Sequence, residues 1–251
     1  MVTRRHFCKT GGALITALAL NTACNDFGGL MSVNDGRLTA KPHRPSKSSG
    51  PGQTYLGMDR DRDAILQLPK ASANGPVPLL LMLHGATQSA EDMLDYLGKI
   101  PEETGVAILS VNSRQETWDA IRGSFGRDVD FINHALERAY DQAAIDPDHL
   151  AIGGFSDGAS YALSLGLING DLFNRVIAFS PGFVIDGPPH GTPRFFISHG
   201  TDDPILPIDR CSRRIVADLK DKSYDVVFRE FPGGHEVPET VAKEALTLVH
   251  S

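Results

Sequence analysis

Uninterrupted apolar runs that end in small or polar residues recur along the chain and predict the strands of a sheet. The run VPLLLMLHG at residues 77–85 is an example, because its apolar segment leads directly into a His-Gly pair. Strands without alternating polar positions are typical of a sheet whose two faces are both covered by helices. Runs of the same form lie at residues 105–112, 149–156, 175–182 and 194–201, and residues 63–69 also predict a strand.

Amphipathic segments separate these runs and predict helices. Between residues 126 and 145, Val129, Ile132 and Leu136 recur at steps of three and four, so one helix face is apolar and the other is charged. Strands that alternate with helices imply an α/β fold with a mostly parallel, doubly wound sheet, whose ligand chemistry lies at the carboxyl ends of the strands. Further helices are predicted at residues 90–100, 159–170, 209–220 and 237–249.

The sequence divides into an N-terminal part and one folded domain. Residues 25–52 are rich in Gly, Ser, Pro and Lys and show no apolar period, which predicts a flexible linker. Residues 53–251 have the length of one domain, and we find no internal repeat. The formal net charge of −7 argues against nucleic acid as a partner.

The first 24 residues have the layout of an export signal. Two arginines in TRRHFCK precede a short apolar stretch, which resembles a twin-arginine signal; an ordinary secretory signal is the alternative. Cys24 follows small residues, as a lipid-attachment cysteine does, so we expect an exported, periplasmic or extracytoplasmic protein that is either anchored to a membrane through Cys24 or cleaved and released. Cys211 is then the one cysteine of the folded domain, and no disulfide can form within it.

A serine between two glycines, in AIGGFSDGAS at residues 151–160, is the first candidate for chemistry. Ser156 follows a predicted buried strand and precedes a predicted helix, which is the context of a nucleophile elbow. Gly154 and Gly158 have a steric reason in such a turn, because side chains two positions either side of the serine would collide across it. A structural serine in a tight turn is the alternative.

A nucleophilic serine needs a base and an orienting acid, which follow it in that fold class in the order Ser, acid, His. Asp202 and Asp203 come directly after the predicted strand at 194–201, and His235 follows two glycines near the end of the chain. Each candidate lies just past the carboxyl end of a strand, so residues remote in sequence can meet at one sheet edge. The order alone leaves the two aspartates open.

Backbone N–H groups are the expected donors to an oxyanion. The HGATQS segment ends a predicted strand, and Gly85 lets its backbone turn closely, so the Ala86 N–H can act together with the Asp157 N–H at the start of a helix. Thr87 is the alternative donor and a candidate substrate contact. Trp118, on a long loop after a strand, is a second candidate substrate contact, with simple packing as the alternative.

Together, LHGATQSAEDM, GRDVDFI, GFSDGAS, HGTDDPILP and GGHE resemble the α/β-hydrolase serine esterases, in particular the phospholipase/carboxylesterase and polyhydroxybutyrate-depolymerase-like groups. The resemblance spans roughly residues 55–240. It implies Ser156 as nucleophile, Asp203 rather than Asp202 as acid, His235 as base, and the Ala86 and Asp157 N–H groups as oxyanion donors. Short late loops predict a site without a large helical cap.

The predicted function is therefore hydrolysis of carboxylic esters, small or lipid-like, through a Ser-His-Asp triad and an acyl-enzyme intermediate. A peptidase, thioesterase or acyltransferase on the same triad is one alternative, and a non-catalytic, lipid-anchored binding protein is another. We expect no cofactor and no metal, since no metal-ligand or phosphate-loop spacing occurs. His84 and His199, beside glycines at strand ends, are interpreted as packing or loop-shaping residues.

Overall fold

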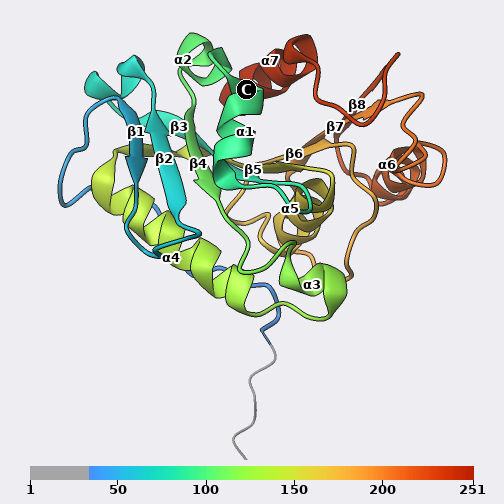
Figure 1. Ribbon diagram of the computed structural model, residues 1–251, viewed down its shortest axis with the longest axis horizontal. Coiled ribbons are helices and arrows are strands. Elements are labelled where there is room, and N and C mark those ends of the chain that lie inside the picture. The colour runs from blue at the N-terminus through green and yellow to red at the C-terminus, as the bar shows by residue number, and fades with distance from the viewer. Residues whose placement is uncertain (1–33) are drawn as a thin grey trace, which may run out of the picture. The chain divides into compact units, whose positions relative to one another are not determined.

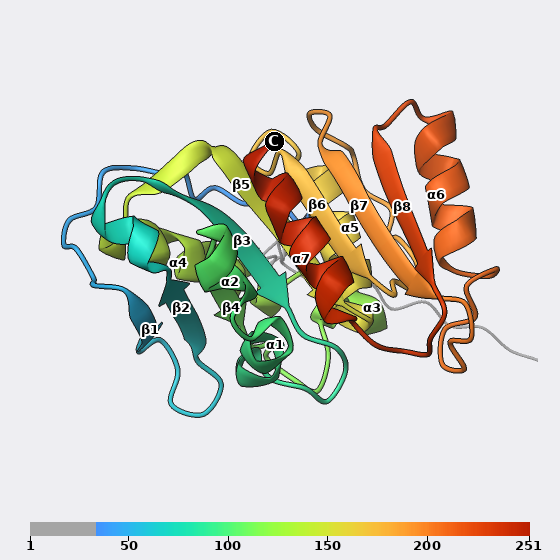
Figure 2. The same ribbon diagram turned by 90° about the horizontal axis from the view of Figure 1, so that it is seen from above.

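The computed structural model describes residues 34–251, and its central feature is an eight-stranded sheet with helices on both faces (Figures 1 and 2). The strand order is β1-β2-β4-β3-β5-β6-β7-β8. β2 pairs antiparallel with β1 and β4, and all other neighbours are parallel. The strands are β1 Gly52–Tyr55, β2 Ala64–Leu68, β3 Val77–Leu83, β4 Ala107–Val111, β5 Ile145–Phe155, β6 Arg175–Phe179, β7 Arg194–Gly200 and β8 Val226–Phe231. The predicted α/β-hydrolase architecture is confirmed.

Helices α1, α2 and α7 cover one face of the sheet, and α4 and α5 cover the other (Figure 2). α1 begins with a capping box, in which the Ser89 hydroxyl accepts from the Asp92 N–H while the Asp92 carboxylate accepts from the Ser89 N–H. The helices are α1 Ala90–Leu97, α2 Ile100–Thr104, α3 Asp119–Arg122, α4 Arg127–Gln142, α5 Asp157–Ile168, α6 Ser212–Asp221 and α7 Glu239–Thr247. Short 3-10 turns lie at Lys70–Ala73 and Leu248–His250.

The apolar side chains of each central strand pack into two separate hydrophobic cores, one on each face of the sheet. In β3, Leu79 and Leu81 pack on the α4 and α5 side, whereas Leu80 and Met82 pack on the α1 and α7 side. This alternation explains the uninterrupted apolar runs, because both faces of each central strand are dry. The segment between β6 and β7, residues 180–193, contains no helix, so the described chain has no helical cap there, as predicted.

Residues 34–52 correct the linker prediction, which is wrong for this part. Leu38 and Ala40 are 2% and 3% exposed and belong to the core beside α4 and α5. The Arg37 guanidinium donates two hydrogen bonds to the Asp171 carboxylate, each 2.8 Å long, and the Leu38 N–H donates to Asn169 Oδ1 at 2.8 Å. The segment needs no core of its own, because it inserts apolar side chains into the core of the domain and bonds its backbone to side-chain amides.

The predicted export signal at residues 1–24, including Cys24, lies outside the described residues, as do residues 25–33. Within residues 34–251, no helix combines the length and the apolar character that a membrane span requires.

Candidate active site

Ser156 occupies a sharp turn between β5 and α5. Its backbone has φ 57° and ψ −119°, a region that costs a residue other than glycine roughly 1–3 kcal/mol. The Ser156 N–H donates to the Phe179 carbonyl at 2.9 Å, so the neighbouring strand β6 holds the turn from below. This conformation lifts the hydroxyl out of the sheet at the carboxyl end of β5.

Two glycines make this turn sterically possible. A Cβ on Gly154 would overlap the Gly158 carbonyl, and a Cβ on Gly158 would overlap the carbonyls of Leu83 and His84 at the end of β3. The start of α5 therefore lies against two neighbouring strand ends with no room for a side chain, as the sequence pattern predicts.

The structure brings the side chains of Ser156, His235 and Asp203 together at this edge. His235 Nε2 lies 2.8 Å from Ser156 Oγ, and His235 Nδ1 lies 2.6 Å from Asp203 Oδ2. An ionised carboxylate can only accept, so Nδ1 carries the proton and Nε2 is free to accept from the serine hydroxyl. The three residues come from the segments that follow β5, β7 and β8.

Asp203, not Asp202, faces the imidazole. Asp203 Oδ1 accepts from the N–H groups of Ile205 at 2.8 Å and Leu206 at 2.9 Å, which fixes the carboxylate plane. Burial alone would raise the pKa of Asp203, but the hydrogen bonds from Leu206, His235 and Ile205 outweigh burial and hold that pKa below its ordinary value. Asp202 is exposed, and among the described residues its carboxylate accepts only from the Thr201 hydroxyl, at 3.3 Å.

The predicted oxyanion donors lie next to Ser156. Among residues 34–251, no hydrogen bond engages the N–H of Ala86 or of Asp157. A Cβ on Gly85 would lie only 3.3 Å from Ser156 Cβ, so this loop approaches the serine closely. Thr87 is a different case, because its N–H already donates to the Glu116 carbonyl at 2.7 Å, and the prediction that its N–H is an alternative donor is wrong.

The Gly85–Ala86 peptide is held in one orientation. The Gly85 carbonyl accepts from His84 Nδ1 at 2.6 Å and from the Gln88 N–H at 3.2 Å. A trans peptide is planar, so fixing this oxygen fixes the Ala86 N–H in the opposite direction. Gln88 also accepts from the Gly85 N–H at 2.9 Å and donates to the Tyr96 hydroxyl at 3.0 Å.

His84 is fully buried, in agreement with its interpretation as a loop-shaping residue. Its Nε2 accepts from the Ser113 N–H at 3.0 Å, so the proton resides on Nδ1 and is donated to Gly85. Burial, with repulsion from Arg62, lowers the pKa of His84 from 6.5 to about 4. The ring is therefore neutral at physiological pH and keeps this pair of bonds.

Trp118 packs inside the domain, which is the alternative to the predicted substrate contact. The side chain is 0% exposed, its Nε1–H donates to the His84 carbonyl at 2.9 Å, and its ring stacks on Tyr161 with a centroid distance of 5.2 Å. The loop that carries Trp118 turns inward, so the ring supports the Gly85 turn from below. The Asp157 carboxylate also contacts this loop, where it accepts from the Thr117 hydroxyl at 2.7 Å.

Sequence reasoning missed Phe155 as part of the site. Its ring lies 4.7 Å from the His235 imidazole between centroids, and Tyr96 lies 5.7 Å from Phe155 on the outer side. Phe155 is 5% exposed, so its buried ring restricts the movement of the imidazole that packs on it. Its place directly before Ser156 in the turn motif was the available signal.

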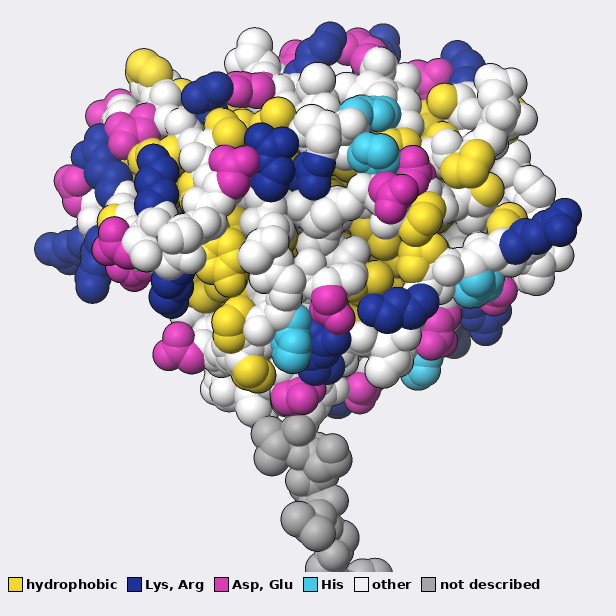
Figure 3. Space-filling model, turned by 180° about the vertical axis from the view of Figure 1, so that it is seen from behind, with side chains coloured by type: hydrophobic (Ala, Val, Ile, Leu, Met, Phe, Trp, Pro, Cys, Tyr) yellow, Lys and Arg dark blue, Asp and Glu magenta, His cyan; other side chains and the backbone are white. Residues whose placement is uncertain are grey.

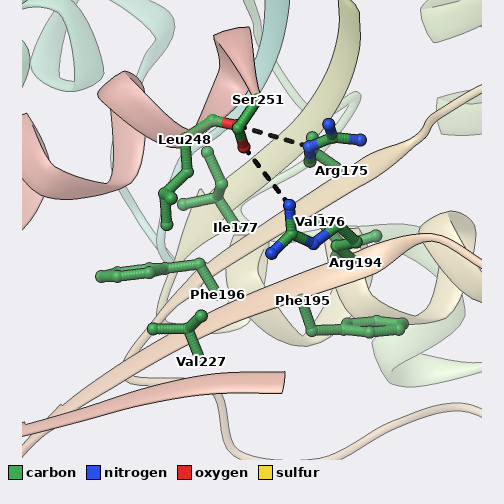
Figure 4. Close-up of a pocket in the computed structure, with 9 residues that line it drawn as sticks. All are labelled: Arg175, Val176, Ile177, Arg194, Phe195, Phe196, Val227, Leu248 and Ser251. Carbon is green, nitrogen blue, oxygen red and sulfur yellow. Dashed lines mark hydrogen bonds between the residues drawn. The ribbon is translucent and has the colours of Figure 1, made fainter. Parts of the chain in front are cut away.

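The other end of the sheet carries a cavity that is separate from this site. Its volume is about 20 Å³, and Arg175 and Arg194 line it at the starts of β6 and β7, where they donate to Leu248 and Ser251 (Figure 4). Ser156 lies at the opposite ends of these parallel strands. The back face of the molecule mixes acidic and basic side chains (Figure 3), and no cluster of metal-ligating residues occurs within residues 34–251.

Comparisons with known proteins identify related sequences. Residues 70–250 match the profile of the Phospholipase/Carboxylesterase family. NocK of Nocardia uniformis subsp. tsuyamanensis, which carries a provisional name as an esterase, is 32% identical over 146 residues, or 54% of this chain and 42% of NocK. Poly(3-hydroxybutyrate) depolymerase of Ralstonia pickettii is 29% identical over 139 residues, or 47% of this chain and 27% of that enzyme. The chain thus matches less than half the length of either curated relative.

Solved structures share the fold at low sequence identity. FphF of Staphylococcus aureus, a fluorophosphonate-binding serine hydrolase determined with bound substrate, superposes with a TM-score of 0.68. The superposition covers 80% of this chain and 100% of FphF at 17% identity. This likeness establishes the architecture alone.

Proposed function

Because the chain belongs to the phospholipase/carboxylesterase family of α/β-hydrolases, we propose that it hydrolyses carboxylic esters with Ser156 as nucleophile, His235 as base and Asp203 as orienting acid. The observation that carries the proposal is the continuous hydrogen-bonded chain from Asp203 through His235 to Ser156, at 2.6 and 2.8 Å. Its distances are those that nucleophile activation requires.

Acylation begins when Ser156 Oγ attacks the ester carbonyl and its proton passes to His235 Nε2. The negative charge that develops on the carbonyl oxygen is held by the N–H groups of Ala86 and Asp157, and one such donor is typically worth about 3 to 4 kcal/mol at the transition state. The tetrahedral intermediate collapses, the C–O bond of the ester breaks, and the departing alcohol takes the proton from His235.

Deacylation reverses the proton path. A water molecule attacks the acyl-enzyme, gives its proton to His235 Nε2, and forms a second tetrahedral intermediate in the same oxyanion hole. Its collapse releases the carboxylic acid and returns the proton to Ser156 Oγ. Throughout both steps Asp203 keeps Nδ1 protonated and stabilises the imidazolium that forms transiently.

Hydrolysis of short p-nitrophenyl esters by Ser156→Ala tests the proposal. The variant should lose about 10³- to 10⁶-fold in kcat while keeping the melting temperature of the wild type. Ser198→Ala is the matched control, because Ser198 is a buried serine on β7 whose hydroxyl has no partner within the described chain. Equal activity in Ser156→Ala and Ser198→Ala would refute the assigned nucleophile.

A substrate panel tests the bond that is cleaved. Esters, thioesters and peptides of matched acyl groups should be ranked by kcat/KM, and we expect esters to lead. A clear preference for peptides or thioesters would overturn ester hydrolysis but keep the triad. A folded protein that a fluorophosphonate probe does not label would instead favour a non-catalytic binding protein.

Export and lipid attachment at Cys24 are part of the same proposal. The paired arginines, the short apolar stretch and the small residues before Cys24 support them. Metabolic labelling with a fatty acid should mark the wild type and not Cys24→Ser, and both should leave the cytoplasm. Unlabelled wild-type protein in the soluble exported fraction would instead favour cleavage and release.

A further inference from the structure

A second histidine contacts the same carboxylate oxygen of Asp203 as His235 does. His199 lies at the end of β7 and is 0% exposed. Its Nε2 lies 3.1 Å from Asp203 Oδ2, the oxygen that also accepts from His235, and 2.7 Å from the Leu206 carbonyl. Its Nδ1 lies 2.6 Å from Ser212 Oγ at the start of α6.

These partners determine which nitrogen of His199 carries the proton. A carbonyl and a carboxylate can only accept, so Nε2 is protonated. Its hydrogen bonds to the Leu206 carbonyl, and Asp203 Oδ2 lies in charge contact with the same nitrogen at 3.1 Å. Nδ1 then accepts from the Ser212 hydroxyl. Burial lowers the pKa of His199, so the ring stays neutral and this tautomer persists.

We propose that His199 is a positioning residue that acts through Asp203, because its Nε2–H group lies against the carboxylate oxygen that faces His235. The inference rests on the proposed ester hydrolysis at this site. An oxygen with two donors offers less negative charge to each of them. His199 thereby limits how strongly Asp203 stabilises the protonated form of His235, and so sets the pH at which the base becomes available.

Removing this donor strengthens the remaining bond between Asp203 and His235. The imidazolium is then favoured up to a higher pH, and the acid limb of the pH profile of kcat/KM moves upward by about half to one pH unit. The titratable groups near His199 are Asp203, His235 and Glu230, and Glu230 is paired with Arg213. Cys211, whose thiol pKa is raised by burial, precedes the Ser212 that bonds His199.

Three substitutions at one position separate the donated bond from simple packing. His199→Phe fills the space without a donor, and His199→Asn keeps polarity but is too short to reach Asp203. His199→Gln reaches further and can donate from its amide. We expect the acid limb to move upward in His199→Phe and His199→Asn and to stay near the wild-type position in His199→Gln. Ser198→Ala, the neighbouring buried position on the same strand, should leave the profile unchanged.

A second measurement is independent of catalysis. The His235 Nδ1 proton should give a downfield proton NMR signal, which should move further downfield when Asp203 loses its second donor. An unchanged signal and an unchanged acid limb in His199→Phe, or equal shifts in the Asn and Gln variants, would overturn the proposal. If His199→Phe does not fold, the comparison of His199→Asn with His199→Gln tests the proposal by itself. If the wild type hydrolyses no ester, the proposed function fails, and the NMR signals still decide the role of His199.

Discussion

Replacing Asp203 by asparagine is a perturbation whose outcome the local hydrogen bonds determine. Oδ1 of Asp203 accepts from two backbone N–H groups, those of Ile205 and Leu206. An asparagine at this position must therefore keep its amide oxygen there, because a backbone N–H can only donate, whereas the imidazoles of His235 and His199 beside Oδ2 can change tautomer. The NH2 group is then forced into the place of Oδ2, 2.6 Å from His235 Nδ1.

This orientation reverses the tautomer of the base. His235 Nδ1 must accept from the amide, so the proton moves to Nε2, where it points at Ser156 Oγ and the serine can no longer transfer its proton. A wrong tautomer in such a triad costs about 10³- to 10⁴-fold in kcat, which corresponds to about 4 to 5.5 kcal/mol of transition-state stabilisation. The fold itself should persist, since the two backbone bonds remain.

The matched control is the adjacent residue. Asp202→Asn removes the same charge one position away, from an exposed carboxylate that does not contact His235. The kcat of this variant should stay within about threefold of the wild-type value. Initial rates on p-nitrophenyl acetate at pH 7.5, with melting temperatures for each protein, make the comparison. The reasoning would be refuted if the hydrolysis rate of Asp203→Asn fell less than tenfold, or if both variants lost the same fraction of the rate.

Three further predictions concern the parts that hold this site. Leu38→Ala leaves a cavity in the core and should lower the free energy of unfolding by about 2 to 5 kcal/mol, or the Tm by roughly 4 to 20 °C. Thr39→Ala, at an exposed position, should change the Tm little. Equal melting curves for the two variants would show that residues 34–52 do not stabilise the domain. Gly158→Ala should abolish activity or folding, while Gly123→Ala, where a Cβ meets nothing closer than 3.9 Å, should be tolerated, as expression and ester hydrolysis will reveal. Burial lowers the pKa of His84 from 6.5 to about 4, so between these pH values the folded state binds fewer protons than the unfolded chain. The free energy of unfolding should therefore fall by up to about 3 kcal/mol as the pH drops from 6.5 to 4. Urea unfolding at pH 7 and 4.5 measures this loss, which His84→Asn should reduce; an equal loss in both proteins would contradict it.

The sequence predicts the sheet well where strands are buried on both faces and poorly at the edge. β3 and β7 are apolar along their length, so their positions follow from hydropathy alone. β1 is largely exposed and carries no apolar run, so nothing in Gly52–Tyr55 distinguishes it from a loop. The error at residues 34–52 has a related cause, because composition measures what a segment can bury by itself and not what it can bury against a neighbour.

The candidate site follows a similar division. Turn motifs at strand ends place Ser156, Asp203 and His235 at one edge, because parallel strands share that edge whatever the loops do. Whether a loop side chain is buried or exposed depends on the conformation of the loop, and the spacing of residues in the sequence does not determine that conformation. The sequence therefore leaves Trp118 open between a substrate contact and simple packing, and the structure shows it packed beneath the Gly85 turn.

Three histidines at this edge perform different tasks, and burial explains the division. His84 and His199 are both fully buried, and burial lowers the pKa of each, so both rings remain neutral donors. One orients the Gly85–Ala86 peptide and the other contacts the Asp203 carboxylate, and neither task survives a change of protonation. The His235 side chain is 16% exposed and keeps its Nε2 toward Ser156. In the proposed mechanism the His235 ring gains and loses a proton in each half-reaction and must meet water and substrate, whereas His84 and His199 only hold geometry and are therefore best buried.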